Sequence, residues 1–256
     1  MTFISNAKYF LGTPFAFRLV KPMLEMRSYE YRILCKMVQS GNVVFDVGAN
    51  TGGYSILFAN LVGGNGSVHA FEPIPSTFAA LSKNVSRARL SGRISTNRCA
   101  IGDHNGLVQM NLPDADSTEA SMVRHNFASW GSQRVKNYSC ELKTIDTYVR
   151  ERGLDKVDFV NIDVEGGELL VLGGMKSIMA KPDAPNIMLE MFPIWMRDYG
   201  FKVEDVFDLF SNFGYGLYFI GHDRLIACKT PGVAKSLIAF PQHLNFLAIR
   251  KAVLPM

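Results

Sequence analysis

The sequence predicts an α/β fold built on a mostly parallel β-sheet. Short runs rich in Val, Ile and Phe alternate along the chain with segments whose apolar residues recur at helical spacing, which is the pattern of repeated β-α-β units. The run at 43–47 contains a single polar residue, Asp46, as expected of a strand buried on both faces. With 256 residues, the chain is long enough for one domain with a substantial core.

The first half of the chain predicts three strands separated by helices. A glycine-rich turn follows the first strand, and Tyr54, Leu57 and Leu61 then repeat at helical spacing until Gly63-Gly64 ends the helix. A second helix follows the second strand. The strands of this half are expected at 43–47, 67–72 and 94–101.

The second half contains an expected insertion and four further strands. Between 107 and 142 the pattern changes to short polar, strand-like stretches, which we interpret as an insertion on the substrate side of the sheet. Residues 41–256 form the expected domain, and 1–40 a helical or flap segment before it. Three further helices are expected: one at 145–152, one that follows Gly166-Gly167 and ends near 179, and one at 203–213. Four further strands are expected at 158–163, 186–191, 215–220 and 246–250.

Charge and cysteine content narrow the class of protein. The 27 basic and 23 acidic residues give a net charge of +4 and form no basic block, so no nucleic-acid partner is indicated. The four cysteines are widely spaced and form no C-x-x-C pair, which suggests neither a zinc site nor a disulfide framework. A cytoplasmic location is therefore expected.

The N-terminal stretch 9–26 is rich in Phe and Leu, but Arg18 and Lys21 interrupt it. It falls short of the ~18 apolar residues that a membrane span needs, and it lacks the pattern of a cleaved signal peptide. We expect no transmembrane segment; the stretch could pack on the domain or make peripheral contact with a membrane.

The turn "GANTGG" that follows the first strand points to a nucleoside ligand without phosphate. It departs from the dinucleotide pattern G-x-G-x-x-G because Asn50 occupies the second glycine position, where the backbone would have to approach a pyrophosphate. Gly48 and Gly52 still permit the turn. Glu72 follows the second strand 20 positions after Gly52, where a carboxylate can accept hydrogen bonds from ribose hydroxyls.

S-adenosylmethionine fits this set of features. It has a ribose but no phosphate, and its sulfonium and ammonium groups are positive, so the charge of Asp46 would attract rather than repel it. The sequence therefore predicts S-adenosylmethionine as the cofactor.

Five stretches of the sequence, two of which include the glycine turn and Glu72, resemble motifs of one known family. The stretches "FDVGANTGGYS", "AFEPIPSTFAALSKN", "CAIGDHNG", "TIDTYV" and "VDFVNIDVEGGELLVLGGM" occur in the order and approximate spacing of the FkbM-like methyltransferases. The resemblance covers about residues 41–191. It implies a class I, Rossmann-like methyltransferase sandwich: a seven-stranded, mostly parallel sheet with an antiparallel last strand and helices on both faces. It also implies methyl transfer to an oxygen of a sugar, polyketide or related metabolite.

The chain departs from the family pattern in two places. Asn161 stands where family members often have Lys, and Gly166-Gly167 where they have Gly-Ala.

The resemblance implies that the adenine lies beside Ala100, Ile101 and Asp103. The full set of expected cofactor-binding residues is Asp46, Gly48, Asn50, Thr51, Gly52, Glu72, Pro73, Ala100, Ile101, Asp103 and Asp163.

The expected catalytic residues are Asp163, Glu165 and Glu190. Methyl transfer from a sulfonium is an in-line displacement, and an alcohol acceptor needs a general base or a metal ion to lose its proton. Asp163 and Glu165 follow the fourth strand, where capping of the next helix is the competing role. Glu190, at the end of the fifth strand, could act with Asp163 as a base or as part of an oxygen-ligand Mg²⁺ site.

Histidines and large aromatic residues supply weaker candidates. His125 and His222 could act as bases because imidazole titrates near neutral pH, although a loop histidine is more often solvated. His104 could touch the adenine, and His69 is expected to be packed within a strand. Trp130, Trp195 and Phe192 could line an acceptor pocket or simply pack in the core.

Two alternative functions remain open from the sequence. One is an NAD-linked oxidoreductase, which Asn50 disfavours on steric grounds. The other is a cofactor-binding protein that keeps the fold without catalysis, which Asn161 makes conceivable. Methylation of a nucleobase amine is disfavoured, because those enzymes have an Asp/Asn-Pro-Pro-aromatic block where this chain has "DVEG".

Overall fold

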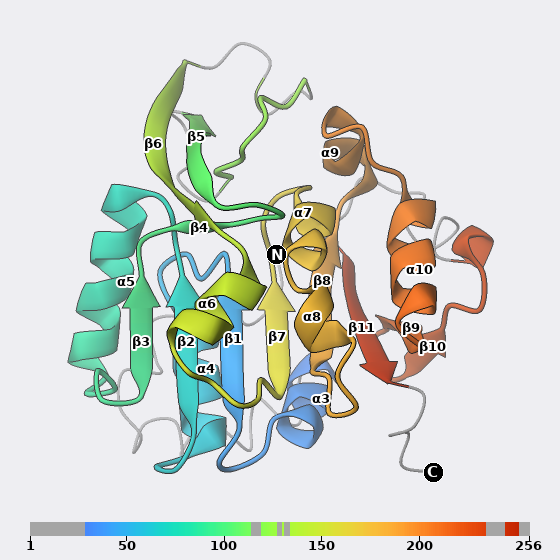
Figure 1. Cartoon of the computed structure of the whole chain (residues 1–256), viewed down its shortest axis with the longest axis horizontal. Coiled ribbons are helices and arrows are strands. Elements are labelled where there is room, and N and C mark those ends of the chain that lie inside the picture. Colours follow the sequence, from blue (N-terminus) through green and yellow to red (C-terminus); the bar gives the residue numbers. More distant parts are fainter. Residues whose placement is uncertain (1–28, 114–118, 127–129, 131–133, 234–243, 251–256) are drawn as a thin grey trace.

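Eight strands in the described part of the chain form one mixed sheet, in the order β10-β9-β11-β8-β7-β1-β2-β3 (Figure 1). The computed structural model describes residues 29–113, 119–126, 130, 134–233 and 244–250. The strands of this sheet are β1 (Val43–Val47), β2 (Ser67–Phe71), β3 (Ile94–Asn97), β7 (Phe159–Ile162), β8 (Asn186–Met191), β9 (Tyr215–Ile220), β10 (Leu225–Ala227) and β11 (Leu244–Arg250).

The strand directions confirm the predicted α/β fold. From β3 to β8 every neighbouring pair is parallel, while β11 runs antiparallel to both β8 and β9. The prediction of seven strands is wrong by one, because β10 returns along β9 after a turn closed by Gly221 N–H and Arg224 O, 3.0 Å apart. With three residues, β10 is too short to show a periodic pattern.

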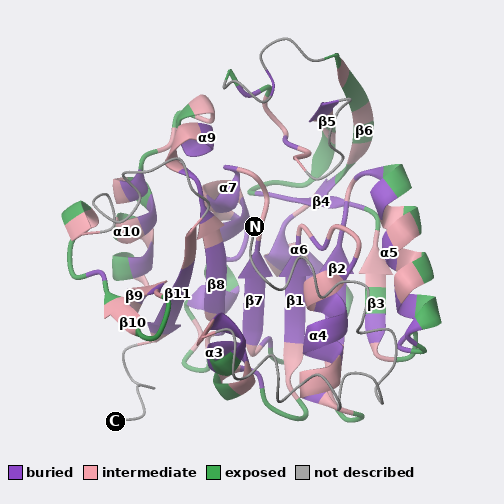
Figure 2. Cartoon of the chain, turned by 180° about the vertical axis from the view of Figure 1, so that it is seen from behind, coloured by how far each residue is buried: buried purple, intermediate pink, exposed green. Residues whose placement is uncertain are grey.

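Helices cover both faces of the sheet (Figures 1 and 2). Apolar residues of the first three helices pack in one cluster with the β1 and β2 side chains of that face, and residues of the later helices pack in a second cluster on the opposite face. The first group is α3 (Tyr29–Met37), α4 (Gly53–Val62) and α5 (Pro75–Arg87), and the second is α6 (Ile145–Glu151), α7 (Glu168–Gly173), α8 (Lys176–Met179) and α10 (Val203–Asn212).

A small second sheet, in the order β4-β6-β5, stands beyond the carboxyl ends of the main parallel strands (Figure 1). It consists of β4 (Ala100–Ile101), β5 (Gly106–Pro113) and β6 (Val135–Lys143). The single strand expected at 94–101 is therefore wrong: residues 94–97 pair with β2 in the main sheet, whereas 100–101 pair with β6. The insertion expected at 107–142 corresponds to the β5–β6 hairpin and the segment between them.

Two helical details also differ from the expectation. The helix predicted to run to about 179 is divided at Gly174, where a side chain would collide with the Gly102 carbonyl oxygen, 2.0 Å from the position of a Cβ. The unpredicted helix α9 (Pro193–Asp198) follows β8 directly and begins with proline at its first position, which suits a helix start.

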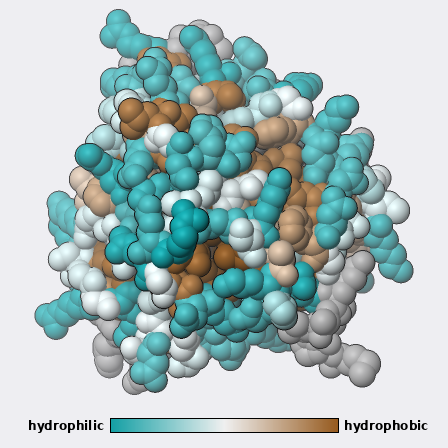
Figure 3. Space-filling view, viewed as in Figure 1, coloured by the Kyte–Doolittle hydropathy of each residue, from teal (hydrophilic) through white to brown (hydrophobic). Residues whose placement is uncertain are grey.

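The surface in the view of Figure 3 is largely hydrophilic, with apolar areas between the elements. Among the described residues, Leu107 on the β5–β6 hairpin is the one large apolar side chain that is exposed. None of the described helices is both long enough and apolar enough to cross a membrane. The expected membrane contact at 9–26 lies outside the described residues.

Candidate active site

The loop after β1 is a tight left-handed turn that crosses the end of β7. Gly48, Asn50 and Gly52 have φ values of 82°, 49° and 93°, a region that glycine enters freely and asparagine better than most residues. A Cβ on Gly48 would lie 1.7 Å from the main-chain oxygen of Asp163. Glycine at 48 is therefore what allows the β1 loop to touch the end of β7.

Glu72 is built into this loop. Its Oε2 accepts a hydrogen bond from Asn50 N–H at 3.0 Å, and its Oε1 accepts one from Ile74 N–H at 2.9 Å. The side chain is 5% exposed, and burial raises its pKa to about 7, against the two hydrogen bonds. Each carboxylate oxygen keeps a second lone pair, so the pair of hydroxyls on a ribose fits this residue.

Asp46 lies beneath the loop in an internal hydrogen-bond network. It accepts hydrogen bonds from the Ser55 hydroxyl and, at 2.9 Å, from the Asn161 amide. Asp46 is 1% exposed, and burial raises its pKa although both hydrogen bonds lower it. Asn161 thus has a definite partner: it satisfies a buried carboxylate in the neighbouring strand.

The residues expected around the adenine have different surroundings. Ala100 is buried in the same apolar cluster as Ile74, next to Glu72 and Pro73. Ile101 packs into the core cluster on the face of α6 to α8, whereas Asp103 is exposed and its Oδ1 lies 2.7 Å from His104 Nδ1, within hydrogen-bond distance. The contacts of these residues with an adenine remain predictions.

Asp163, Glu165 and Glu190, which we call the acidic trio, converge at the ends of β7 and β8. Each offers a carboxylate oxygen, and these oxygens lie within 4.8 Å of one another. The pKa of Asp163 is raised well above its usual value by burial, by the charge of Glu190 and by a hydrogen bond with Glu190. Burial and the charge of Asp163 likewise raise the pKa of Glu165. Burial and mutual repulsion therefore favour the protonated forms of Asp163 and Glu165.

Helix α7, which Asp163 and Glu165 could cap, has no side-chain capping bond at its N-cap residue. The helix begins at Glu168, and its N-cap residue is Gly167. The Glu168 carboxylate accepts a hydrogen bond from Gly166 N–H at 2.9 Å. Its second oxygen, Oε2, is buried without a hydrogen-bond partner, and burial raises the pKa of Glu168 to about 7.

A pocket opens beside the trio, and part of its wall comes from residues that the sequence did not single out. Tyr54 of α4 and Asn245 of β11 line it together with Asp163 and Glu190. Behind them, Glu30 of α3 accepts hydrogen bonds from Tyr54 Oη at 2.5 Å and from Asn245 Nδ2 at 2.7 Å. No local motif marks these residues, because they meet only when distant parts of the chain pack together.

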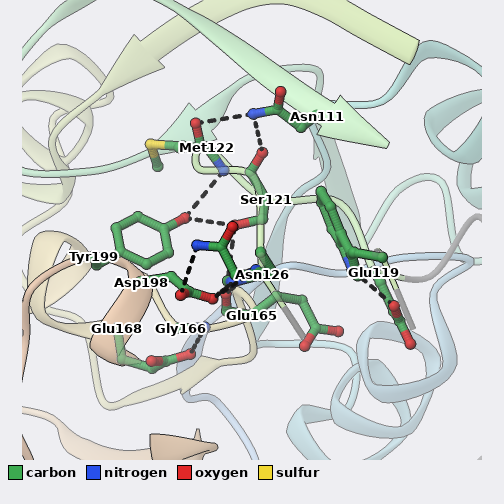
Figure 4. Close-up of polar contacts among 12 residues, drawn as sticks. Asn111, Glu119, Ser121, Met122, Asn126, Glu165, Gly166, Glu168, Asp198 and Tyr199 are labelled. Carbon is green, nitrogen blue, oxygen red and sulfur yellow. Dashed lines mark hydrogen bonds and ion pairs between the residues drawn. The ribbon is translucent and has the colours of Figure 1, made fainter. Parts of the chain in front are cut away.

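His125, a possible base by sequence, lies near the trio with both ring nitrogens hydrogen-bonded within the protein. It is 1% exposed, with Nδ1 2.9 Å from Asp198 Oδ2 and Nε2 3.0 Å from the main-chain oxygen of Glu165. Burial lowers its pKa against both hydrogen bonds. Both nitrogens face acceptors, so neither is free to take a proton from a substrate. Figure 4 shows Asp198 and Glu165 beside Ser121, Met122 and Tyr199 of the same network.

The other aromatic and histidine candidates have mainly structural surroundings. His69 is buried in β2 and bonded to Tyr148 Oη at 2.8 Å, as expected for a packed residue. His222 is exposed in the turn between β9 and β10. Trp130 and Trp195 are buried, and both rings contact His125, so they pack around this histidine.

The strand order with an antiparallel β11, the glycine turn after β1 and the acidic residues after β2 and β7 define a class I methyltransferase type of fold. The model of the methyltransferase FkbM domain matches residues 46–217. The chain therefore belongs to the FkbM methyltransferase family. This assignment confirms the family resemblance and favours methyl transfer over the NAD-linked alternative.

Individual relatives agree with this assignment. The chain is 33% identical over 162 residues to the 31-O-demethyl-FK506 methyltransferase FkbM of Streptomyces tacrolimicus, covering 54% of this chain and 61% of the relative. It is 30% identical over 148 residues to the hexuronic acid methyltransferase AglP of Haloferax volcanii, covering 58% and 56%. The chain thus spans less than two thirds of the length of these two relatives.

A solved structure supports the fold. The crystal structure of methyltransferase FkbM from Methylobacillus flagellatus KT superposes with a TM-score of 0.51 at 16% sequence identity, over 82% of this chain and 44% of that one. At this identity the similarity concerns the fold alone.

The Gly48 contact predicts a sharp difference between two glycine substitutions. Gly48→Ala should lower the free energy of unfolding by at least about 2 kcal/mol, because it combines a left-handed φ with a collision against Asp163. Gly64→Ala, whose new Cβ meets no atom within 4 Å, is the control. Urea denaturation of both variants tests this, and equal stabilities would contradict the contact.

Proposed function

We propose that this protein transfers a methyl group from S-adenosylmethionine to a hydroxyl oxygen of a small molecule or glycan. The observation that carries the proposal is the arrangement at one sheet edge: Glu72 and the glycine turn on one side, and the acidic trio with its pocket on the other. A ligand lying across this edge would have its ribose at Glu72 and its sulfonium toward Asp163, as in open α/β sheets whose ligands bind beyond the strand ends.

The residues present fit S-adenosylmethionine. Glu72 would hold the ribose hydroxyls, Ala100 and Asp103 the adenine, and the turn from Gly48 to Gly52 the amino-acid end. Asp46, Asp163 and Glu190 are acidic groups near the expected position of the cationic groups, and a bound cation would lower the pKa values that burial raises at Asp46 and Asp163. When bound, the sulfonium supplies an electrophilic methyl group and leaves as a neutral thioether.

In the proposed reaction Asp163 removes the proton of the acceptor hydroxyl while that oxygen attacks the methyl carbon. The new C–O bond forms as the C–S bond breaks, and the bonding electrons remain on sulfur. Asp163 and Glu190 share a hydrogen bond, so one carboxyl can remain protonated while the other acts as the base. The pocket wall of Tyr54 and Asn245 offers polar groups that could orient the acceptor.

The names of relatives favour an oxygen acceptor. Besides the FK506 and hexuronic acid enzymes, the 2-O-methyltransferase NoeI of Sinorhizobium fredii is 23% identical over 176 residues, covering 65% of this chain and 70% of the relative. Because the acceptors in these names differ from one another, the proposal names the class of reaction and a class of acceptor, hydroxyl-bearing small molecules or glycans.

The acidic trio is also the group of described residues that could hold Mg²⁺, through one oxygen from each residue. There, Mg²⁺ would lower the pKa of the acceptor hydroxyl. Asp163 and Glu190 already share a hydrogen bond, and its proton offsets the repulsion between the two carboxyl groups. We therefore expect turnover to survive EDTA treatment; loss of turnover that Mg²⁺ restores would assign the metal role instead.

Glu72 should be required for cofactor binding. Glu72→Ala removes the acceptor of the ribose hydroxyls and should weaken binding of S-adenosylhomocysteine, the demethylated product, by about 1.5–3 kcal/mol. Calorimetry on the folded variant measures this loss. Unchanged affinity would remove Glu72 from the site.

Binding should also depend on pH through Glu72. Its folded-state pKa is raised to about 7, so the carboxylate that accepts the ribose bonds forms above that pH and is lost below it. Affinity for S-adenosylhomocysteine should therefore rise as the pH increases from about one unit below this pKa to about one unit above it. The Gln side chain of Glu72→Gln cannot ionise, so the affinity of this variant should change little with pH. If its affinity rises with pH as steeply as that of the natural protein, the pH dependence belongs to another group.

Asp163 should matter more for turnover than for cofactor affinity. Asp163→Asn keeps the size of the side chain but removes the base, and should reduce turnover by about 10²–10⁴-fold with a much smaller change in affinity for S-adenosylhomocysteine. Single-turnover assays and calorimetry separate the two effects. Normal turnover would refute the catalytic role.

The overall function is tested by binding followed by acceptor identification. Calorimetry with S-adenosylmethionine and S-adenosylhomocysteine tests the cofactor, and absence of binding would reject the proposal. A mass-shift screen with S-adenosylmethionine against extracts of the source organism then identifies the product. If the methylated product is RNA, the acceptor is a nucleic acid and not a small molecule or glycan. Cofactor binding without any turnover would favour a non-catalytic protein.

A further inference from the structure

The loop that carries Glu165 is folded tightly against α9. Glu165 has a φ of 57° and Gly166 a φ of 96°, and the left-handed region is unfavourable for a residue with a side chain such as Glu165. A Cβ on Gly166 would lie 2.8 Å from the main chain of Trp195 in α9. This turn therefore persists only if the surrounding structure holds Glu165 in place.

His125 provides the shortest hydrogen bond to the Glu165 main chain among the described residues. Its Nε2 lies 3.0 Å from the carbonyl oxygen of Glu165. A carbonyl oxygen only accepts, so Nε2 carries the proton and donates it. On the other side of the ring, Nδ1 lies 2.9 Å from Asp198 Oδ2 at the end of α9. The ring thus joins the insertion to α9 and to the trio loop.

The orientation of the His125 ring is fixed by its neighbours. The Trp195 ring stacks on it at a centroid distance of 4.8 Å and an angle of 16°, and the Trp130 ring meets it edge-on at 5.0 Å and 83°. Both ring nitrogens face acceptors, so the two hydrogen bonds together require the doubly protonated ring, which the Asp198 carboxylate favours although burial, the larger effect, lowers the pKa of His125. The direction of the Nε2–H bond is therefore preset.

A second connection reaches the same carbonyl. Ser121 Oγ lies 3.5 Å from the Glu165 oxygen and 2.8 Å from Tyr199 Oη, which also accepts a hydrogen bond from Met122 N–H at 3.0 Å (Figure 4). The Ser121 contact is longer than that of His125, which makes His125 the stronger of the two.

We propose that His125 is a positioning residue for the acidic trio. Its Nε2–H bond holds the Glu165 carbonyl, keeps Glu165 in the left-handed conformation and so directs its carboxylate toward Asp163 and Glu190. His125 acts through Glu165 and contacts neither cofactor nor acceptor. The consequence for methyl transfer rests on the proposed function, whereas the effect on the conformation of Glu165 does not.

Two substitutions of matched character separate this role from simple packing. In His125→Gln the side-chain amide can reach the Nε2 position and still donate to Glu165, but in His125→Asn it reaches only the Nδ1 position beside Asp198. Both variants remove the ring between the tryptophans. A purely structural role predicts the same outcome for both, while positioning predicts that only the glutamine variant retains the arrangement.

Crystal structures of the two variants test the inference without any ligand. We expect Glu165 to keep a left-handed φ in His125→Gln and to leave it in His125→Asn. Retention of the conformation in both variants, or its loss in both, would overturn the proposal. His69→Gln, a change at another buried histidine far from the trio loop in sequence and bonded to Tyr148, controls for general loosening of the core.

Sinefungin provides a binding readout of the trio, because an amine replaces the methylated sulfur of S-adenosylmethionine. In His125→Asn its dissociation constant should rise about tenfold, as expected for loss of one well-placed charged contact, while that of S-adenosylhomocysteine stays nearly unchanged. His125→Gln should resemble the natural protein in both, and equal losses of sinefungin affinity would argue against positioning. If the natural protein binds neither compound, the proposed function fails, and the crystal structures still decide the role of His125.

Discussion

The site depends on the contact between the β1 loop and the end of β7. Val47 and Ile162 are paired neighbours in the parallel register, so the residues that follow them, Gly48 and Asp163, meet at the sheet edge. The Gly48 backbone can approach the Asp163 carbonyl only because no Cβ intervenes. On the other side, pairing of Val47 with Phe71 brings Glu72 to the same edge. Three consecutive strands in the sheet thereby deliver their polar ends to one place.

This convergence has an electrostatic cost. Asp46, Glu72, Asp163 and Glu165 are all acidic; the first two are buried and the other two partly buried, and burial is the first cause of the raised pKa of each. Folding for stability alone would not gather such groups. A cationic ligand relieves the repulsion, which gives the sulfonium and ammonium of the proposed cofactor a physical role beyond shape.

The segment between β5 and β6 contacts both the loop that carries Glu165 and the end of α9. The β5–β6 hairpin stands beyond the strand ends, and the segment between its strands supplies His125 and Ser121 to the Glu165 loop. Tyr199, just after α9, bonds to that same segment. Elements outside the sheet therefore contact the main chain of one catalytic candidate, Glu165.

Much of the fold followed from local patterns. The strands at 43–47, 186–191 and 215–220 coincide with the structure, because a short apolar run bounded by turn residues specifies a buried strand within a few residues. The prediction of one strand at 94–101 was wrong because the pairing partner changes within it: residues 94–97 pair in the main sheet and 100–101 in the small one. Local hydrophobicity does not encode which strand a segment will pair with.

For the site, the sequence by itself determined the residues whose chemistry is local: the glycine turn with Asn50, Glu72 after the second strand, and the acidic residues at the ends of β7 and β8. Only the tertiary structure decided how they combine. It joined Glu30 to Asn245 across almost the whole chain, gave Asn161 a carboxylate partner, and placed His125 in hydrogen-bond contact with the main chain of Glu165. These contacts bridge residues far apart in sequence, and packing of the whole domain selects them, since no short-range propensity favours one distant partner over another.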